Sequence, residues 1–461
     1  MKLSSEHKLF LKKAEKKAFD KTHREKIKFN ISKYDAAVEK GKKIYSNLDL
    51  ARNHAGYIKY KVINDLDKYL IAFEDNFKRN GGKVIWAKDT REAIHEILKI
   101  AIENKVKKVV KSKSMTTEEI ELNDAFKKNR IESVETDLGE FIVQQAGQKP
   151  YHIVTPAMHM SKEDIAGLYH KKFSTPENLT PEELTGYTRN LLREKFIESD
   201  LGVSGANFLI AETGSIALTE NEGNALLSMS FPRIHIAIAG IEKIIPKLDD
   251  LDLFWPLLAT HGTGQNMTVY NSIISGPKKA NEKDGPEEMY VILLDNGRTN
   301  LLSKERQRQA LSCIRCGACL NACPVYKNIG GHTYDTTYSG PIGSVITPYL
   351  KDQKTWKHLS FASSLCGRCT EVCPVKIPIH ELLLVNRNDA VKNGFFTYFE
   401  KESIKISTTA LSSRNKLDMF GGKVKNFGAK LFVEKMWGPR RSLPQFAEKS
   451  FSKQWKDEHK E

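Results

Sequence analysis

The spacing of the cysteines restricts the fold of this chain more than any other feature. All seven cysteines among its 461 residues lie in two runs, Cys-x2-Cys-x2-Cys-x3-Cys-Pro and Cys-x2-Cys-x3-Cys-Pro. Two-residue spacers allow a tight turn to hold three thiolates around one cubane cluster, whereas the last cysteine, followed by proline, leaves in a new direction and ligates the other cluster. The sequence therefore predicts a ferredoxin-type module with two iron–sulfur clusters.

Crossed ligation divides the cysteines into a group of four and a group of three. Cluster 2 lacks one cysteine ligand, because the second run is one cysteine shorter than the first. Ser363 lies three residues before Cys366, where a complete run would have its first cysteine. The expected ligands are Cys313, Cys316, Cys319 and Cys373 for cluster 1, and Cys323, Cys366 and Cys369 for cluster 2.

Three structures of cluster 2 are compatible with the missing cysteine. We favour a [4Fe–4S] cluster whose fourth iron site is open or has a non-cysteine ligand. The alternatives are a [3Fe–4S] cluster and a cluster completed by a rescue ligand such as His358 or His332. Structural zinc sites also use paired Cys-x2-Cys units, but four cysteines at this spacing with a trailing proline fit zinc poorly.

The composition is that of an ordinary globular protein, with 40% hydrophobic and 28% charged residues. The length is sufficient for about two or three domains. The first residues carry charges in place of a signal-peptide core, and no stretch approaches the roughly 18 apolar residues of a membrane span. Because every cysteine belongs to the ligand pattern, disulfides are not expected. We therefore expect a soluble cytoplasmic protein.

The net charge of +15 is concentrated at the two ends of the chain. Residues 1–60 hold 16 lysines and arginines against 7 acidic residues, and residues 391–461 hold 15 against 8. Such ends are compatible with an acidic protein partner, peripheral contact with an acidic membrane surface, or simply solubility. Nucleic-acid binding is disfavoured, because no zinc-finger or helix-turn-helix signature and no interleaved base-stacking aromatic residues accompany the lysines.

The hydrophobic pattern predicts four segments. Residues 1–63 form a charged helical segment in which no chemistry is visible, and residues 64–295 form an α/β domain with a mostly parallel sheet. A mainly helical iron–sulfur domain over 300–390 and a basic tail over 391–461 follow. In the α/β domain we expect strands at 83–87, 106–110, 131–136, 152–154, 208–211, 215–218, 234–239 and 291–294, and helices at 66–80, 90–104, 116–128 and 181–198. A further polar helix is expected at 303–311.

A candidate anion pocket lies at the carboxyl end of the strand at 106–110. Parallel sheets bind ligands at this edge, and two lysines and two hydroxyls precede a helix there. The alternative is a capping box of Thr116 and Glu119, which needs neither lysine. Glu212 lies in the bend between two short apolar runs, where the pattern predicts a hairpin. The candidate pocket residues are Lys111, Ser112, Lys113 and Glu212.

Residues 211–215 (Ala-Glu-Thr-Gly-Ser) and the cysteine runs at 313–326 and 366–375 resemble the lactate utilization protein B family. The resemblance extends over roughly residues 20–440. It rests on the combination of the cysteine runs with this α/β domain, because the cysteine runs alone are common. It implies that the α/β domain has a fold similar to that of sugar-phosphate isomerases and coenzyme A transferases. The family shares the seven-cysteine pattern, so Ser363 is not a defect.

The resemblance also implies a function. Members belong to a bacterial system of three components that oxidises L-lactate to pyruvate, and this chain would be its electron carrier, with two [4Fe–4S] clusters. Its partners would be the other lactate-utilization subunits and an electron acceptor. The alternative is a catalytic oxidoreductase whose α/β domain binds a small anionic substrate. Against it, the chain has no flavin or nicotinamide signature that would divide a two-electron oxidation into single-electron steps.

Overall fold

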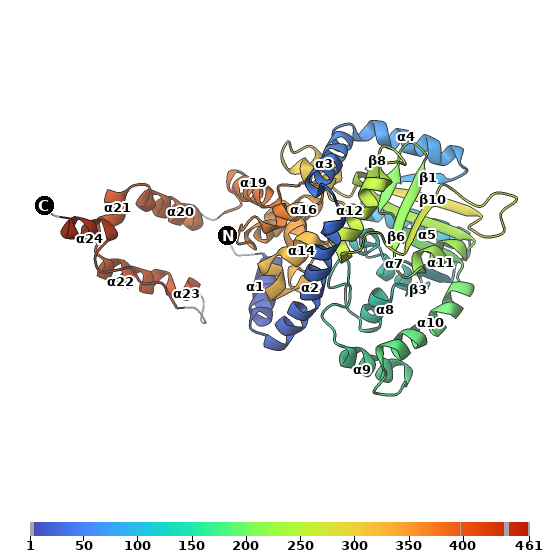
Figure 1. Ribbon diagram of the computed structural model, residues 1–461, viewed down its shortest axis with the longest axis horizontal. Coiled ribbons are helices and arrows are strands. Elements are labelled where there is room, and N and C mark those ends of the chain that lie inside the picture. Colours follow the sequence, from blue (N-terminus) through green and yellow to red (C-terminus); the bar gives the residue numbers. More distant parts are fainter. Residues whose placement is uncertain (1–3, 397, 438–441, 460–461) are drawn as a thin grey trace. The chain divides into compact units, whose positions relative to one another are not determined.

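The computed structural model describes residues 4–396, 398–437 and 442–459 (Figure 1). Two compact units are present, one over residues 2–390 and one formed mainly by residues 391–461. The first unit contains the sheets and all the cysteines. Its hydrophobic core is continuous between the α/β region and the cysteine region, since Phe208 and Leu293 belong to the same buried cluster as Cys319 and Leu359.

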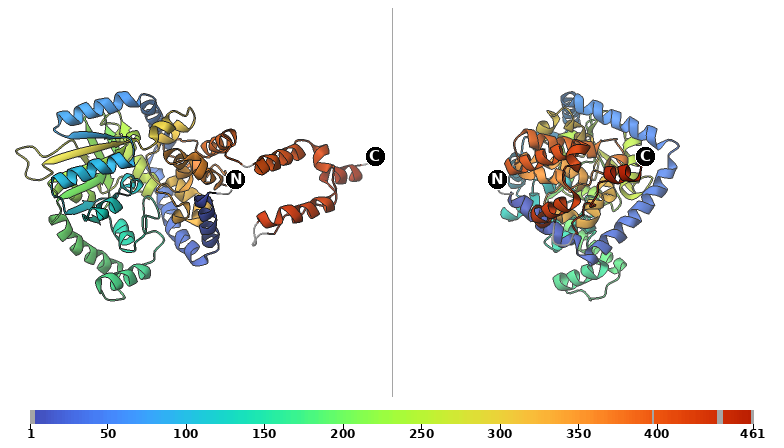
Figure 2. Two further views of the ribbon diagram at one scale, coloured as in Figure 1. Left: turned by 180° about the vertical axis from the view of Figure 1, so that it is seen from behind. Right: turned by 90° about the vertical axis from the view of Figure 1, so that its left-hand side faces the viewer.

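A six-stranded parallel sheet with helices on both faces is the centre of the first unit (Figures 1 and 2). Its strands are rich in valine and isoleucine because both faces are buried. In β7, Ile236 faces the core shared with α5 (Thr90–Glu103), and Ala237 faces the core shared with α4 (Leu66–Arg79). The strand order is β1 (Lys83–Ala87), β10 (Glu288–Leu294), β7 (Ile234–Gly240), β4 (Leu201–Gly205), β2 (Lys108–Lys111) and β3 (Glu132–Glu135).

A smaller four-stranded sheet packs beside the parallel one. Its order is β8-β5-β6-β9, and β5 pairs with β6 in antiparallel register, so the hairpin expected around Glu212 is present. The last strand, β9, pairs antiparallel to β6. The bounds are β5 (Phe208–Ile210), β6 (Ser215–Glu220), β8 (Ile244–Ile245) and β9 (Tyr270–Ile274).

The predicted fold class, a mostly parallel α/β domain followed by a mainly helical iron–sulfur region, is confirmed. Several details differ. The strand expected at 152–154 is wrong, because this segment forms bends. The helix expected at 116–128 is divided into α6 (Met115–Glu119) and α7 (Leu122–Lys128), with Glu121 in the left-handed region at φ 53°. The central strand β4 was not predicted, because two of its five residues are glycines, which weaken the strand pattern.

The region after the α/β domain consists of short helices around the cysteines. The polar helix expected at 303–311 is instead a 3-10 turn, η3 (Gln307–Ser312). The cysteine region is completed by α13 (Arg298–Leu302), α14 (Ala318–Ala322), α15 (Pro324–Ile329), η4 (Gly331–Tyr334), α16 (Gly340–Leu350), α17 (Gln353–Trp356), η5 (Lys357–Phe361), α18 (Arg368–Glu371) and α19 (Ile379–Lys392).

The N-terminal helices belong to the same core. Helix α1 (Ser5–Ala18) packs against α15, α2 (Lys21–Gly41) against α12 (Leu251–Thr263), and α3 (Leu48–Asn64) against η3. The other helices of the α/β region are α8 (Leu138–Gln145), α9 (Lys162–Phe173), α10 (Pro181–Ile197) and α11 (Asn224–Ser230).

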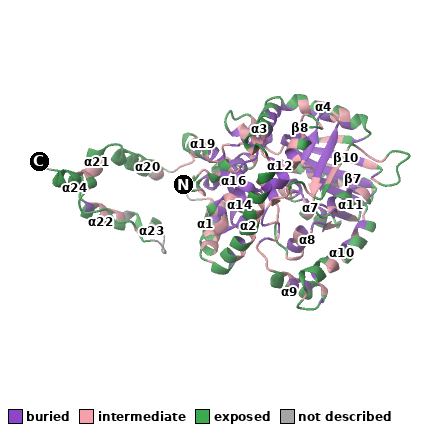
Figure 3. Cartoon of the chain, viewed as in Figure 1, coloured by how far each residue is buried: buried purple, intermediate pink, exposed green. Residues whose placement is uncertain are grey.

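The described residues beyond 390 are mostly helical and largely exposed (Figure 3). Large apolar side chains remain at their surface, among them Tyr398, Leu411 and Phe427. Among the described residues, no helix is long and apolar enough to cross a membrane. The helices of this unit are α20 (Tyr398–Leu411), α21 (Arg414–Asp418), α22 (Gly422–Phe432), α23 (Glu434–Trp437) and α24 (Phe451–Glu458).

Candidate iron–sulfur centre and adjoining cavity

The loops that begin the two cysteine runs have the same backbone. Arg315 and Leu365, each one residue before a cysteine, have φ 64° and φ 54°. Gly317 and Gly367, each one residue after that cysteine, have φ 80° and φ 79°. A left-handed conformation in a non-glycine residue costs on the order of 1–3 kcal/mol and persists where the site requires it. The repeated strain therefore shows that the two loops have similar conformations around these cysteines.

In each loop, a backbone N–H donates a hydrogen bond to the side chain of the first residue of the loop. The N–H of Arg315 donates to Cys313 Sγ at 3.4 Å, and the N–H of Leu365 donates to Ser363 Oγ at 3.1 Å. Ser363 therefore lies in the position that Cys313 has in the first loop. An eighth ligand, if the chain supplies one, is expected at this serine.

The last cysteine of each run also accepts a backbone hydrogen bond. Cys323 Sγ accepts from the N–H of Tyr326 at 3.5 Å, and Cys373 Sγ accepts from the N–H of Ile377 at 3.4 Å. Such bonds stabilise a thiolate over a thiol. In the first run, proline at the first position of α15 begins the helix that carries the chain away from the cluster loop.

The cysteine thiols interact electrostatically in two groups. Burial, and then the charge of Cys313, raise the pKa of Cys316 and of Cys319, and Cys373 contributes to both shifts. Burial raises the pKa of Cys373 to about 11, and Cys313 contributes to that shift too.

The second group contains the remaining three cysteines. Burial raises the pKa of Cys323, with a contribution from Cys366. Burial, then Cys323, raise the pKa of Cys369 to about 11, and Cys366 adds to the shift. Each run therefore places its last cysteine beside the other run.

This donor set fits iron–sulfur clusters. Buried thiols with raised pKa values keep their protons unless positive charge replaces them, and the iron of a cluster supplies such charge. Sulfur donors in groups of four and three, with backbone N–H groups on the sulfurs, are the surroundings that such clusters use. Cys366, which is exposed, is the most accessible of the seven.

Two buried lysines lie near Cys313. Burial lowers the pKa of Lys59 to about 7 and that of Lys243 to about 8, and the charge of Cys313 opposes both shifts. Lys59 Nζ donates to the carbonyl oxygens of Glu242 and Ile244 at 2.6 and 3.0 Å. These lysines would offset the negative charge of cluster 1. Lys59 was not predicted, because its partners are backbone groups distant along the chain.

The N-terminal segment thus contributes to the centre, although no chemistry was visible there. Besides Lys59, α3 contains Arg52, whose Nε donates to the carbonyl oxygen of Cys373 at 3.1 Å. Both residues lie on one helix, seven positions apart, so two helical turns bring them to the same face.

The two histidines considered for cluster 2 contact backbone carbonyl groups and aromatic rings. The Nε2 atom of His332 lies 2.7 Å from the carbonyl oxygen of Lys149, and its ring packs on Tyr151. The Nδ1 atom of His358 lies 3.2 Å from the carbonyl oxygen of Thr355, and its ring stacks on Trp356. Ser363 has the geometry of a ligand position that these two lack.

The four candidate anion-pocket residues are not brought together. Lys111 is fully buried, and its Nζ lies 2.8 Å from Glu135 Oε1 and 3.2 Å from Glu118 Oε1. Glu212 lies at the β5–β6 hairpin, where its Oε2 accepts from the N–H of Leu248. Only Ser112 and Lys113 line a cavity. The predicted pocket therefore divides into a buried ion cluster, a hairpin contact and two cavity residues.

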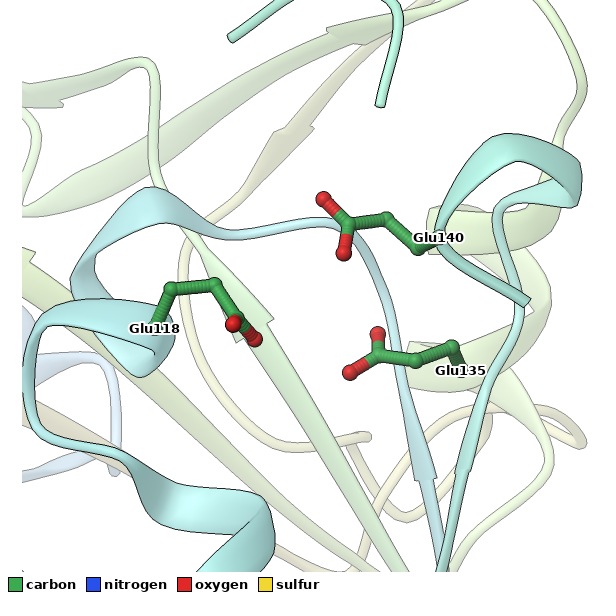
Figure 4. Close-up of side chains that lie close together, drawn as sticks. All are labelled: Glu118, Glu135 and Glu140. Atoms are coloured by element: carbon green, nitrogen blue, oxygen red, sulfur yellow. The ribbon is translucent and has the colours of Figure 1, made fainter. Parts of the chain in front are cut away.

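The ion cluster around Lys111 has the form of a metal site. Carboxylate oxygens of Glu118, Glu135 and Glu140 lie within 4.8 Å of one another, and Figure 4 shows the three side chains pointing toward one another. The Lys111 ammonium already supplies a positive charge there. Burial raises the pKa of Glu135 to about 7 and that of Glu140 well above its usual range. We interpret the cluster as a lysine with glutamates that are partly protonated.

The capping box expected at Thr116 and Glu119 is wrong. The N-cap of α6 is Ser114, whose Oγ accepts from the N–H of Thr117 at 3.3 Å. Glu119 instead forms a two-pronged ion pair with Arg298, at 2.8 and 3.0 Å. The local spacing suggested a cap, but a buried arginine 179 positions later determines where this carboxylate lies.

Arg298 begins a buried ionic chain between the α/β region and the first cysteine loop. Its Nε donates to Glu242 Oε2 at 2.6 Å, and Arg315 Nη2 lies 3.3 Å from Glu242 Oε1. The Arg315 guanidinium stacks on Tyr338 at 4.3 Å, and Tyr338 Oη donates to Glu119 at 2.6 Å. Arg298, and then Arg315, overcome the effect of burial and lower the pKa of Glu242 to about 2.

A half-open cavity of about 520 Å³ lies between the parallel sheet and the first cysteine loop. Its lining includes Ser112 and Lys113 after β2, Asn207 after β4, and both Arg315 and Cys316. Gly262 and Thr263 also line it, and they belong to the end of α12. The cavity thus reaches a predicted ligand of cluster 1.

Comparisons with known proteins agree with this arrangement. Residues 70–294 match the LUD domain, and residues 309–377 match the 4Fe-4S dicluster domain, which includes all seven cysteines. A crystal structure of a DUF162 family protein from Deinococcus radiodurans is 14% identical and covers 50% of this chain and 98% of that one, with a TM-score of 0.26. At that score the similarity supports no argument.

Curated relatives share most of their length with this chain. Lactate utilization protein B of Bacillus pumilus is 47% identical over 336 residues, 73% of this chain and 71% of that protein. The protein of the same name from Bacillus cytotoxicus is 41% identical over 415 residues, 87% of each chain. The one from Bacillus cereus strain AH820 is 44% identical over 77% of this chain and 75% of its own. The chain belongs to the lactate utilization protein B family.

Proposed function

We propose that this chain is the electron-carrying subunit of a bacterial system that oxidises L-lactate to pyruvate. The lactate part of the proposal comes from the names of its relatives. The electron-transfer part is supported by one observation above all, the division of the thiols into two groups that exchange their last cysteines. Two clusters that share loops in this way lie close together and form a short path for electrons.

The ligand assignment follows the same division. Cluster 1 would be held by Cys313, Cys316, Cys319 and Cys373, and cluster 2 by Cys323, Cys366 and Cys369. Ser363 would complete cluster 2 as a non-cysteine ligand, because its hydroxyl occupies the place that the Cys313 sulfur has in the equivalent loop. Both clusters would be [4Fe–4S], and they would supply single-electron transfer when bound.

The residues around the clusters would set their properties. Lys59, Lys243 and Arg315 would stabilise the added negative charge of a reduced cluster 1, because they lie near Cys313 in a buried region where charges are poorly screened. Cluster 2 would be the exchange point with partner proteins, since Cys366 is exposed. The other lactate-utilization subunits and an electron acceptor are the partners we expect.

Anaerobic reduction experiments test the carrier role. We expect L-lactate to leave the clusters of the isolated chain oxidised, and to reduce them once the other subunits of the system are added. Visible absorption and electron paramagnetic resonance (EPR) report the reduction. Rapid reduction of the isolated chain by lactate would contradict a pure carrier role.

That contradicting result would support the second candidate, a catalytic α/β domain. The observation that favours this candidate is the cavity, which joins the carboxyl edge of the sheet to Cys316. A substrate bound there would lie beside cluster 1. The α/β domain would then be the site of the reaction as well as a scaffold.

A further inference from the structure

The cavity lies where the chain topology opens the parallel sheet. After β2 the chain continues to β3 on one side, whereas after β4 it continues through the hairpin to β7 on the other side. Adjacent strands whose connections leave in opposite directions open a crevice at their carboxyl ends, and open α/β sheets bind their ligands in such crevices. Ser112 and Lys113 follow β2, and Asn207 follows β4, so the cavity occupies this crevice.

Two buried hydrogen-bonding groups in the lining have no partner among the described residues. Ser112 is 2% exposed, and its Oγ makes no hydrogen bond. The side chain of Arg315 is 9% exposed, and its Nη1 makes none either. A buried polar group without a partner costs roughly 1–3 kcal/mol. Each group therefore keeps an unused hydrogen-bonding capacity in the wall of the cavity.

Lys113 adds a second positive charge to the lining. Its Nζ lies 3.4 Å from Asp137 Oδ2 and 3.1 Å from the carbonyl oxygen of Val154, and its side chain is 31% exposed. A single, long ion pair leaves an ammonium group with capacity for another acceptor. Lys113, Ser112 and Arg315 together suit an anion.

The remaining wall limits the charge of that anion. Asp137, Glu220 and Glu222 also line the cavity. Three carboxyl groups oppose a dianion such as a phosphate monoester, because every added negative charge meets like charges in a poorly screened crevice. A monoanion with a neutral hydroxyl or oxo group meets less of this repulsion. Amide and hydroxyl side chains for such a group are present at Asn207 and Thr219.

We propose that this cavity is a binding site for a small hydroxy- or oxo-carboxylic acid, with the carboxylate held by Lys113, Ser112 and Arg315. The apolar part of the lining, at Ile153, Met158 and Leu218, contacts the carbon chain of the acid. The acid keeps all its bonds in this site, and its charge acts on the neighbouring centre.

The site is coupled to cluster 1 through the first cysteine loop, a consequence that rests on the proposed function. Cys316 and Arg315 line the cavity and belong to the loop that would hold the cluster. A carboxylate beside them stabilises the oxidised cluster relative to the reduced one, because reduction adds negative charge. Binding of the acid therefore lowers the reduction potential of cluster 1 and leaves cluster 2 nearly unchanged.

Pyruvate is a suitable probe, because it is an oxo-acid monoanion. Isothermal titration of the anaerobically purified full chain with both clusters should show one bound pyruvate per chain. The Lys113→Met and Ser112→Ala variants should each weaken binding by about tenfold or more, which corresponds to the loss of one charged or buried hydrogen bond. Lys172→Met, which replaces an exposed lysine of α9 outside the cavity, should bind as the unaltered chain does.

Redox titration followed by EPR gives the second readout. Saturating pyruvate should shift the potential of one cluster downward in the unaltered chain, and the shift should be absent in Lys113→Met. Loss of binding in Lys113→Met with normal iron content and unfolding temperature would support the site. Absence of pyruvate and lactate binding to a chain with both clusters intact, or binding that neither Lys113→Met nor Ser112→Ala weakens, would overturn it.

These outcomes are separate from the carrier role. A chain that carries electrons between partners but binds no acid would retain the proposed function and lose only this inference. A chain that binds pyruvate but contains no iron–sulfur clusters would retain this inference and lose the proposed function.

Discussion

Ser363 lies where the first thiolate of the second run would lie, and a hydroxyl is a harder and weaker ligand for iron than a thiolate. Cluster 2 should therefore hold one of its irons less tightly than cluster 1. This expectation can be examined by changing one side chain without altering the loop.

We expect Ser363→Ala to lose about one iron per chain during anaerobic incubation with a chelator, because the fourth iron of cluster 2 then has no side-chain ligand. Ser363→Cys should retain that iron longer than the unaltered chain, since it restores the complete run. Iron content and EPR of the resulting [3Fe–4S] cluster measure both effects.

Ser364→Ala is the matched control, because the neighbouring serine is exposed and lies outside the ligand spacing. Equal iron retention in the unaltered chain, Ser363→Ala and Ser363→Cys would show that the hydroxyl does not ligate cluster 2.

The buried Glu140 is expected to make the stability of the folded chain depend on pH. Burial, then the charge of Glu135, raise the pKa of Glu140 well above its usual range, so the folded chain binds a proton there that the unfolded chain releases. Stability from this group is present at low pH and decreases as pH rises through the folded pKa. Glu140→Gln, which removes the ionisation, should stabilise the chain increasingly between pH 6 and 8.5, by on the order of 1 kcal/mol at the upper end.

The unfolding temperatures of the unaltered chain and Glu140→Gln, measured across that pH range, test this expectation. Glu163→Gln is a suitable control, because Glu163 is exposed and its pKa is lowered, first of all by its own backbone N–H. A difference between Glu140→Gln and the unaltered chain that stays constant with pH would refute the raised pKa.

The ionic chain from Glu119 to Arg315 joins the helices and strands of the α/β region to the first cysteine loop. Arg298 is 1% exposed and pairs with two carboxylates, Glu119 and Glu242. Removal of one partner leaves buried charges uncompensated, which costs about 3–5 kcal/mol. Arg298→Met should therefore lower the unfolding temperature strongly and make cluster 1 labile.

Arg306→Met provides the comparison, because Arg306 forms an exposed ion pair with Glu381. Exposed pairs contribute about 0–1 kcal/mol, so this variant should unfold almost as the unaltered chain does. Thermal unfolding followed by circular dichroism, with cluster absorption recorded in parallel, measures both variants. Similar behaviour of the two variants would contradict the structural role of the buried chain.

Elements that depend on neighbouring residues were predicted correctly. The strand at Lys83–Ala87 and the hairpin around Glu212 agree with the structure, because apolar runs and turn residues determine them. Contacts between residues distant along the chain were not predicted. Thr116 and Glu119 have the spacing of a capping box, but Arg298 binds the glutamate. Lys111 was assigned to a pocket, although carboxylates from α6 and β3 enclose it.

The candidate centre shows the same division. The cysteine spacing predicts which thiols share a cluster, because ligand geometry restricts the loops, and this assignment stays a prediction. Lys59 and Arg52 were not predicted, since a charged helix contains many lysines and arginines and only the tertiary structure distinguishes the buried ones.

For the whole molecule, the division at residue 390 makes the C-terminal segment separable. A chain ending at Asn393, which keeps α19 complete, should retain its iron and unfold within about 2 °C of the full chain. The reason is that the described core clusters include no residue beyond Ala390. Differential scanning calorimetry and iron analysis of both chains measure this. A large loss of iron would show that the segment supports the centre.

The C-terminal segment carries basic residues and exposed apolar side chains, so we expect it to contribute to binding of the partner subunits. Residues 391–461 hold 15 lysines and arginines against 8 acidic residues. We expect the shortened chain to bind its partner subunits more weakly, with the largest difference at low salt, where charge attraction is least screened. Equal binding of the two chains at low salt would refute a docking role.

We expect the seven cysteines to hold two cubane clusters. The decisive measurement is the content of iron and acid-labile sulfide in the anaerobically purified full chain. About eight of each per chain are predicted for two [4Fe–4S] clusters, and about seven irons would indicate a [3Fe–4S] second cluster. Zinc without sulfide would contradict the account, because the cysteines would then be structural and the path for electrons would not exist.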